Sequence, residues 1–454
     1  MTTSPRLASS VLLATFLAAW DSTVVGTIGP TIVQHLGGMA WYPWMLAGFM
    51  IAATVMTPLV GSLSGQHPPE TLYRWSIGLF LLGSIASASA SSMGWFIVTR
   101  IVQGAGAGGI LTLGLILMGQ HYQGLDRIRM QGRLSAMWGL AGLLGPTLGG
   151  FVAQWLSWRG PFVINVLLGA LALVALGSLP PATPPRDRHP LDWAGVLWLA
   201  GWLTAGISAL TVFQQDPQSG LGWLLVGAAL GLALGWWRAE RRASHPLIPL
   251  AWLRDSRITA PSILALTASG TLYAAVLILP LWLHTAWAFG PLAVGLAILP
   301  LPVGWAAGSL LTAPLVARMG LSTAVRIGLG EMSVGVLLNE AAGAAGQWPR
   351  VVLGGALLGL GVGMVIMATL NSVQSQVPRH ELGVATGLYN LGRNLGNTLG
   401  PGIMGGLVLL LWSHPLGDPA AASLTRAVHH VFWGVVILTA IIALKSSPPE
   451  GQNS

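Results

Sequence analysis

The feature that most constrains this chain is a succession of apolar runs, each long enough to cross a lipid bilayer as a helix. The hydrocarbon core of a bilayer is about 30 Å thick, and roughly 20 helical residues cover it. Fourteen such runs follow one another along the 454 residues. We predict spans at 7–35, 42–63, 73–91, 95–119, 133–156, 160–180, 192–213, 220–237, 258–284, 290–317, 322–343, 348–372, 382–412 and 428–445. The sequence therefore predicts an all-α membrane protein.

The charge content agrees with a lipid environment. Only 7% of the residues are charged and 53% are hydrophobic, whereas soluble domains carry about 25% charged residues. The net charge of +8 comes from arginines scattered between the apolar runs, so we expect no nucleic acid partner. The chain has no cysteine, which excludes disulfides and thiolate metal sites. We expect no metal and no cofactor.

The distribution of basic residues predicts the orientation of the chain. If the N-terminus lies in the cytoplasm and the spans alternate, sixteen of the 21 basic residues are cytoplasmic, three are outside and two lie within spans. Cytoplasmic loops of membrane proteins carry such an excess of Lys and Arg. We therefore expect a multi-pass protein of the cell inner membrane with both termini cytoplasmic. The first apolar run carries an Asp and indicates a retained helix rather than a signal peptide.

Two polar linkers divide the chain. A proline-rich segment at 180–190 and a basic segment at 238–257 enclose two predicted spans. We expect this two-helix hairpin to lie beside the rest of the protein. The predicted divisions are an N-terminal six-helix bundle at 1–180, linkers with two extra helices at 181–257, a C-terminal six-helix bundle at 258–446 and a disordered tail at 447–454.

A short glycine-proline repeat connects the two predicted bundles. It lies in the fifth helix of each bundle and consists of Gly145, Pro146, Gly149 and Gly150 in the first and Gly400 and Pro401 in the second. A Gly-Pro kink and close helix packing explain each copy alone. Their equivalent positions favour a transporter built by duplication.

A run of glycines at 104, 106, 108 and 109 lies inside a predicted span, with no strand before it and no Gly-Lys-Ser. It predicts close helix packing rather than a phosphate-binding loop. We find no ATPase motif, metal cluster or nucleophile arrangement in the sequence. We therefore expect a protein that is not an enzyme and that uses ion coupling as its energy source.

Asp21 and Arg100 lie at similar depth in two predicted spans. At 1.5 Å per residue, Asp21 is about 21 Å and Arg100 about 22 Å from the cytoplasmic edge. A charged side chain at this depth must face a partner or a cavity, or be neutralised by a proton. The pair is a candidate for proton coupling, and the alternative is a fixed structural ion pair.

Further polar residues lie in the second half of the chain. Asn390, Arg393, Asn394 and Asn397 follow a spacing of three and four residues, so they share one helical face. This stripe predicts either a substrate cavity or gate, or hydrogen bonds between helices. Glu331 also lies at mid-span depth and, by depth, is within reach of Arg393. Glu331 is a further candidate for proton coupling.

Three segments together resemble the fourteen-spanner drug:proton antiporters of the major facilitator superfamily. Residues 141–150 read AGLLGPTLGG, which is similar to the antiporter motif of helix 5. The segment from Arg100 through Gln103 to Gly106 is similar to the Arg-x-x-Gln-Gly signature of helix 4. Residues 21–30 resemble the Asp-x-Thr-x-Val-Asn…Pro signature of helix 1, with Gly26 in place of Asn. The resemblance implies the major facilitator fold, and it adds Gln103 to the coupling or cavity candidates.

One loop departs from the pattern of this superfamily. After the second helix the superfamily reads Gly-x-Leu-x-Asp-Arg-x-Gly-Arg-Arg, but residues 61–70 read GSLSGQHPPE. The acidic and basic residues that help to close the cytoplasmic side in the superfamily are missing here. The sequence therefore does not predict which contacts close that side in this chain.

The resemblance implies a proton-coupled exporter of drugs or other amphipathic or cationic small molecules that works by alternating access. Its partners would be a small-molecule substrate, protons and the lipid bilayer, and we expect a monomer. Two alternatives stay open. One is a proton-driven importer of the oligopeptide type, and the other is a non-transporting membrane sensor or scaffold.

Overall fold

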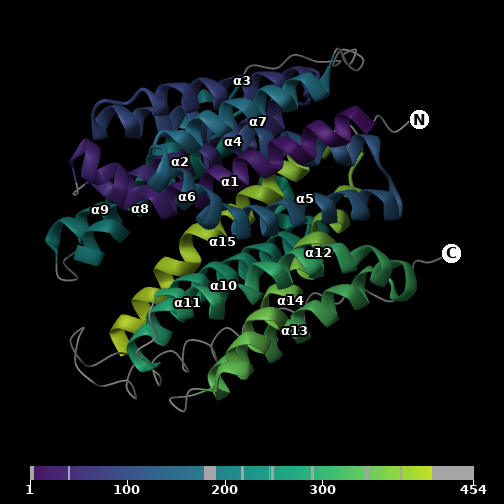
Figure 1. Cartoon of the computed structure of the whole chain (residues 1–454). Helices are drawn as coiled ribbons and strands as arrows, with labels where there is room; N and C mark the ends of the chain where they lie inside the picture. The colour runs from purple at the N-terminus through teal and green to yellow at the C-terminus, as the bar shows by residue number, and fades with distance from the viewer. Residues whose placement is uncertain are drawn as a thin grey trace. The chain divides into compact units, whose positions relative to one another are not determined.

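The computed structural model is helical along most of the residues that it describes (Figure 1). It describes residues 5–38, 41–177, 191–215, 219–244, 246, 250–287, 291–342, 347–378 and 381–411. Every span predicted before residue 412 overlaps a described helix. The last predicted span at 428–445, the proline-rich linker and the tail lie outside the described residues.

The chain divides into two compact units. The first consists of Met1–His121, Ala141–Ser256 and Val377–Leu391, and the second of Tyr122–Leu140, Arg257–Gln376 and Gly392–Ser454. Two helices, α5 (Gly124–Leu144) and α15 (Leu382–Leu411), contribute residues to both units. The division of the chain at 180 and 257 remains a prediction from the sequence.

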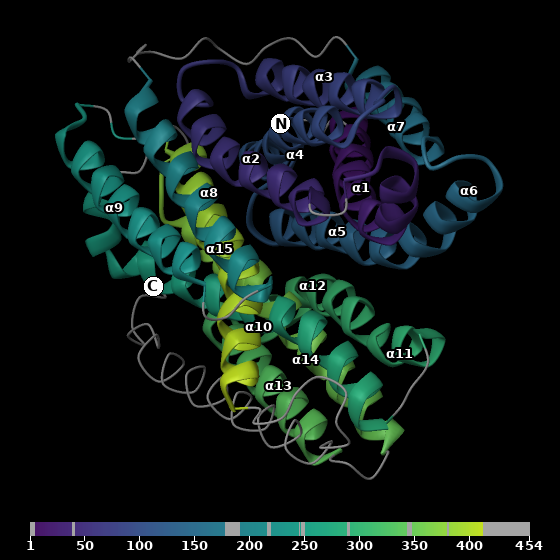
Figure 2. The same cartoon turned by 90° about the vertical axis from the view of Figure 1, so that its left-hand side faces the viewer.

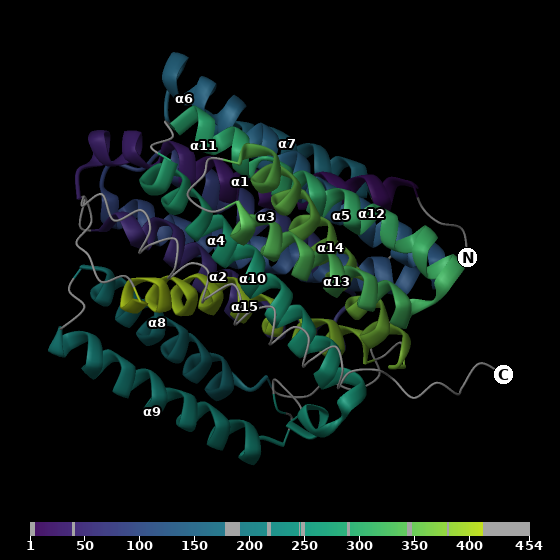
Figure 3. The same cartoon turned by 90° about the horizontal axis from the view of Figure 1, so that it is seen from below.

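The first unit is built around one central helix. Its elements are α1 (Pro5–Leu36), α2 (Tyr42–Leu63), α3 (Pro69–Ala88), α4 (Met93–His121), the end of α5, η2 (Gly145–Gly149), α6 (Gly150–Trp155), α7 (Gly160–Leu176), α8 (Trp193–Gln215), α9 (Gly220–Arg242), η3 (Leu250–Arg254) and the start of α15. Helix α4 packs against α1, α2 and α3 (Figure 1). Helices α8 and α9 pack on each other as a hairpin (Figures 2 and 3).

The glycine run of α4 explains its central place. A Cβ at Gly104 or Gly108 would overlap the backbone of α2 at Phe49 and Ala53, and one at Gly106 would overlap α3 at Phe80. The absence of side chains therefore lets both neighbouring helices approach closely. The prediction that these glycines serve helix packing is confirmed.

The second unit contains the first part of α5, α10 (Ser256–Trp287), α11 (Pro291–Ile298), α12 (Pro300–Met319), α13 (Leu321–Ala341), α14 (Trp348–Ser375) and the remainder of α15. Helix α14 packs against α12 and α13. The α5 segment is tied to this unit by polar contacts. Gln131 Nε2 donates to Gln374 Oε1 at 2.7 Å, and the hydroxyls of Ser135 and Ser309 lie 2.6 Å apart.

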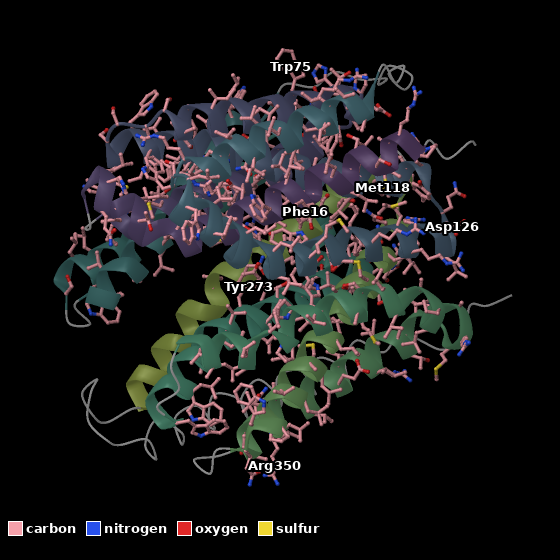
Figure 4. All side chains as sticks on the ribbon, viewed as in Figure 1. Phe16, Trp75, Met118, Asp126, Tyr273 and Arg350 are labelled. Carbon is pink, nitrogen blue, oxygen red and sulfur yellow. The ribbon has the colours of Figure 1, made fainter. Side chains whose placement is uncertain are left out.

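Large apolar side chains cover the outside of several helices. Trp75 on α3 is 74% exposed and points away from its unit (Figure 4). Others on α3, α7, α8 and α9 are also exposed, namely Leu82, Leu167, Leu171, Val174, Leu197, Trp223 and Leu230. Eight described helices are long and apolar enough to cross a membrane, and two shorter helices are also apolar. Lipid is the solvent that such surfaces fit.

Helix boundaries differ most from the prediction at two places. The helix predicted to begin at 133 begins at Gly124, because its first turns are polar and an apolar pattern does not reveal them. The span predicted at 290–317 is interrupted at Leu299 between α11 and α12. Pro300 follows the interruption, and proline has no N–H with which to continue the helical hydrogen bonds.

Candidate functional site

A closed cluster of polar side chains surrounds Asp21 in the first unit. Asp21 lies in the middle of α1 and is 1% exposed, and Arg100 on α4 is fully buried. Arg100 Nη1 donates to Asp21 Oδ2 at 2.6 Å, forming a buried salt bridge. The matching depths inferred from the sequence thus correspond to a direct contact. An ionised pair inside a membrane protein requires such geometry, because each charge alone is costly to bury.

Gln103 connects the two members of this pair. It lies one turn after Arg100 on α4 and is also fully buried. Its Oε1 accepts from Arg100 Nη1 at 2.5 Å, and its Nε2 donates to Asp21 Oδ1 at 2.9 Å. The same Nε2 donates to Ser84 Oγ on α3 at 2.8 Å. Both ends of the Gln103 amide are therefore engaged.

Asn165 is a member of the cluster that the sequence analysis missed. It lies on α7, and its Nδ2 donates to Asp21 Oδ1 at 2.6 Å. The segment GPFVINVLLGALALVAL of α7 is otherwise apolar. A single amide in an apolar span needs a partner inside the protein, so a signal was present. Ser84 gave no such signal, because serines are frequent in α3.

Arg100 has two more neighbours in α2. Its Nε donates to the Met45 carbonyl at 3.4 Å, and its guanidinium carbon lies 4.3 Å from the centre of the Phe49 ring. The aromatic face contributes a further attraction for the cation. The Arg100 charge is therefore held by α1, α2 and α4 together.

A π-helical segment lies directly beside the Asp21 helix. It is η2, which contains Gly145, Pro146 and Gly149 and is followed by Gly150 at the start of α6. Thr23 Oγ1 on α1 is 3.1 Å from the Ala141 carbonyl, to which it donates. A Cβ at Gly145 would overlap Thr23, and one at Gly149 would come within 2.8 Å of the Val24 methyls. The Gly-Pro motif thus changes the helical hydrogen-bond pattern where α1 packs most closely. π-helical turns occur frequently at functional sites.

The loop that departs from the superfamily pattern lies against the start of α15 in the first unit. Ser64 Oγ donates to the Gly61 carbonyl at 2.7 Å. A Cβ at Gly383 would overlap both Ser64 Oγ and the Gly61 carbonyl oxygen. Small residues and backbone, rather than charged side chains, make this contact between α2 and α15.

The polar stripe lies along α15. Asn390 is 1% exposed, and neither its Nδ2 nor its Oδ1 has a hydrogen-bond partner. Arg393 is partly buried on the same helix. Asn394 and Asn397 are partly buried, and Asn397 Oδ1 has no partner. Further along α15, Gly400 lies against Gly270 of α10, and Pro401 continues the helix.

Glu331 lies in the middle of α13. Its Oε2 is buried without a hydrogen-bond partner. The pairing of Glu331 with Arg393 remains a prediction from the sequence. Among the described residues, no group of three or more His, Cys, Asp or Glu side chains is arranged to hold a metal ion.

Comparison with known proteins identifies the family. The family model described as the Major Facilitator Superfamily matches residues 11–238, which is half of the chain. The chain belongs to the major facilitator superfamily. It is therefore a multi-pass integral membrane transporter and not an enzyme.

Relatives of this superfamily member include bacterial and fungal pumps. Multidrug transporter protein MdtP of Bacillus subtilis (strain 168) is 24% identical over 88% of this chain and 75% of its own length. Multidrug resistance protein 3 of the same organism is 26% identical over 90% of this chain and 80% of its own length. Efflux pump FUS6 of Gibberella moniliformis (strain M3125 / FGSC 7600) is 27% identical over 87% and 72%.

Solved structures of the superfamily share the fold. The human organic anion transporter MFSD10 (TETRAN) aligns with a TM-score of 0.70 at 18% identity, covering 98% of this chain and all of that chain. The proton:xylose symporter XylE aligns with a TM-score of 0.65 at 14% identity, covering 98% of this chain and 95% of that chain. The expected major facilitator fold is thereby confirmed, whereas the count of fourteen spans remains a prediction.

Proposed function

We propose that this transporter is a proton-coupled exporter of amphipathic or cationic small molecules, with Asp21 as the proton-binding residue and Arg100 as its charge partner. The observation that carries the proposal is the buried salt bridge between Asp21, in the middle of α1, and Arg100, in the first third of α4. The names of MdtP and Multidrug resistance protein 3 support a drug as substrate.

The geometry suggests how a proton would change the protein. Protonation of Asp21 removes the negative charge that Arg100 faces, so the salt bridge loses its attraction and Arg100 is left as a buried cation. A state that opens the cluster to water then becomes more favourable. Entry of the proton from outside would favour release of the substrate, and its loss to the cytoplasm would restore the substrate-binding form. Coupling arises because the proton and the substrate bind the two states with different affinities.

The remaining candidates support the pair in this proposal. Gln103 positions Asp21 and Arg100, and the η2 segment allows α1 to shift against the end of α5. The polar stripe of α15 lines the substrate path. Glu331 is a second acid that is available for protonation. Both termini face the cytoplasm of the inner membrane, the chain acts as a monomer, and helices α8 and α9 stand outside the transport path.

The test uses purified protein in proteoliposomes with an acidic lumen and ethidium as the probe. Wild-type protein is expected to accumulate ethidium until nigericin collapses the pH gradient. Asp21→Asn keeps the shape of the side chain but cannot titrate, so it should insert normally and lose gradient-driven uptake. Asp21→Glu should keep part of the gradient-driven ethidium uptake, because its side chain can still bind a proton. Ethidium movement in the same direction as protons would instead indicate an importer. Uptake by Asp21→Asn at the wild-type rate would show that coupling lies elsewhere, and no transport of any candidate drug would favour a sensor or scaffold.

A further inference from the structure

The Asp21 carboxylate is surrounded only by hydrogen-bond donors. Arg100 Nη1 faces Oδ2, while Gln103 Nε2 and Asn165 Nδ2 both face Oδ1. This arrangement suits an ionised carboxylate, which only accepts hydrogen bonds. A protonated Asp21 has an O–H group that must donate, and a buried donor without an acceptor is unfavourable. The cluster must therefore change when the proton binds.

Two of the three donors cannot accept a hydrogen bond from a protonated Asp21 without breaking other hydrogen bonds or lacking an acceptor atom. Arg100 has no acceptor atom. Gln103 has one, but its Oε1 already accepts from Arg100 and its Nε2 donates to Ser84 as well as to Asp21. Turning this amide over would place its NH2 group against the Arg100 guanidinium, so that two donors face each other. Gln103 is therefore fixed in its present orientation.

Asn165 differs in one respect. Its Nδ2 donates to Asp21, but its Oδ1 is buried and has no hydrogen-bond partner. Turning this amide over by 180° about its last side-chain bond breaks no other hydrogen bond. It also brings an acceptor to Asp21 Oδ1. Asn165 can thus pair with the ionised carboxylate through its NH2 group and with the protonated carboxyl group through its oxygen.

We propose that Asn165 is a positioning residue for proton coupling, whose amide turns over to accept the Asp21 proton and so allows the buried site to hold it. This inference rests on the proposed role of Asp21. Among the side chains that the structure describes on α1, α2, α3, α4 and α7, the charged or titratable ones at the pair are Asp21 and Arg100 themselves. The other described ones lie toward the helix ends, namely Arg6, His35, Glu70, Tyr73, Arg74, His121 and Arg159.

Removing the Asn165 amide affects the two forms of Asp21 differently. The ionised form loses one of its three donors and keeps Arg100 and Gln103. The protonated form loses the acceptor for its O–H and is left with a buried donor that has no hydrogen bond. The hydrogen bond donated by the protonated carboxyl group is therefore the quantity that reports the role of Asn165.

The matched pair Asn165→Val and Asn165→Thr tests the proposal. The two side chains have nearly the same shape, but only the Thr hydroxyl can donate or accept. Infrared difference spectra recorded across pH identify the protonated Asp21 carboxyl as the C=O band that Asp21→Asn removes. In wild type and Asn165→Thr the band should lie where hydrogen-bonded carboxyl groups absorb, and in Asn165→Val it should move to higher wavenumber. The pH profile of ethidium uptake should differ from that of wild type in Asn165→Val and return toward it in Asn165→Thr.

Each outcome separates the inference from the proposed function. If no band disappears in Asp21→Asn, Asp21 does not bind the proton and both proposals fail. If the band exists but lies at the same position in wild type and Asn165→Val, only the role of Asn165 is overturned. Wild-type protein alone gives a test if the variants do not fold. A wild-type band at the position of a carboxyl group that donates no hydrogen bond contradicts the proposal.

Discussion

At the scale of single residues, Asp21 depends on partners from α4 and α7, and Arg100 depends on a carbonyl and an aromatic ring of α2. None of these contacts is local in sequence. The ion pair lies in a region from which water is excluded, so neither charge can be solvated when its partner is removed. The two residues should therefore behave as one unit in mutational experiments.

A double-mutant cycle measures this dependence. We expect Asp21→Asn and Arg100→Gln each to lower the thermal stability of the protein in detergent, because each leaves a buried charge without its partner. The double variant should lose less stability than the sum of the singles, with a coupling free energy of about 1–3 kcal/mol. The exposed pair Asp126–Arg129 at the start of α5 is the control, and Asp126 is labelled in Figure 4. Additivity at both pairs would contradict a stabilising role for the buried one.

Asn390 offers a second residue-scale experiment. Its buried amide has no hydrogen-bond partner in the described structure, so it contributes little to stability and carries a desolvation cost. We expect Asn390→Leu to leave the melting temperature unchanged or to raise it, while ethidium transport falls. Arg393→Ala should impair transport more strongly. A large loss of stability in Asn390→Leu would indicate a structural amide and remove it from the substrate path.

The sequence predicted some of these residues and not others, for physical reasons. Counting residues along two helices gave the depths of Asp21 and Arg100, and depth was sufficient because the helices are neighbours. Rotation about the helix axis is not fixed by depth, which is why Asn165 was missed and why the approach of Glu331 and Arg393 stays a prediction. The orientation of a helix about its own axis is set by packing, and the single sequence contains that information only indirectly.

At the scale of elements, the Gly145–Gly149 segment joins two helical stretches through a π-helical turn. The motif predicted a special conformation here, but the type of hydrogen bonding depends on how α1 packs against it. Pro146 removes one backbone donor, and the two glycines leave room for Thr23 and Val24. A hydrophobicity pattern likewise does not reveal the early start of α5, whose first turns are polar, or the break before Pro300, which depends on the missing proline N–H.

The contact between Gly149 and Val24 can be tested by compensation. Gly149→Ala adds a methyl group that would lie 2.8 Å from both Val24 methyls, so we expect it to push α1 away and to reduce transport severalfold. Val24→Ala removes those methyls, and the remaining Cβ is 3.2 Å away, which requires only a small shift. The double variant should recover most of the ethidium uptake. If adding Val24→Ala to Gly149→Ala restores no ethidium uptake, the loss of transport is caused by a change in the backbone at residue 149 and not by the contact with Val24.

At the scale of the whole molecule, the orientation in the membrane remains a prediction from basic residues. The chain has no cysteine, so single cysteines can be introduced without background. We expect an impermeant maleimide to label Ser91→Cys in intact cells, because the exposed turn between α3 and α4 is predicted to face outward. Ser4→Cys and Ser454→Cys, which lie outside the described residues, should react only after the cells are opened. Labelling of either terminal position in intact cells would contradict the predicted topology.

The salt bridge also has a consequence for electrical energy. Asp21 and Arg100 together carry no net charge, so the membrane potential exerts little force on this site in the state described here. A proton bound to Asp21 makes the site cationic, and one elementary charge moved across the full membrane is worth about 2.3 kcal/mol per 100 mV. The protonated protein, unlike the unprotonated one, would then respond to voltage. With a neutral substrate, an inside-negative potential would pull the bound proton toward the cytoplasm and drive the cycle even where the two sides have the same pH, whereas exchange of one proton for one monovalent cation would move no net charge and would need a pH difference.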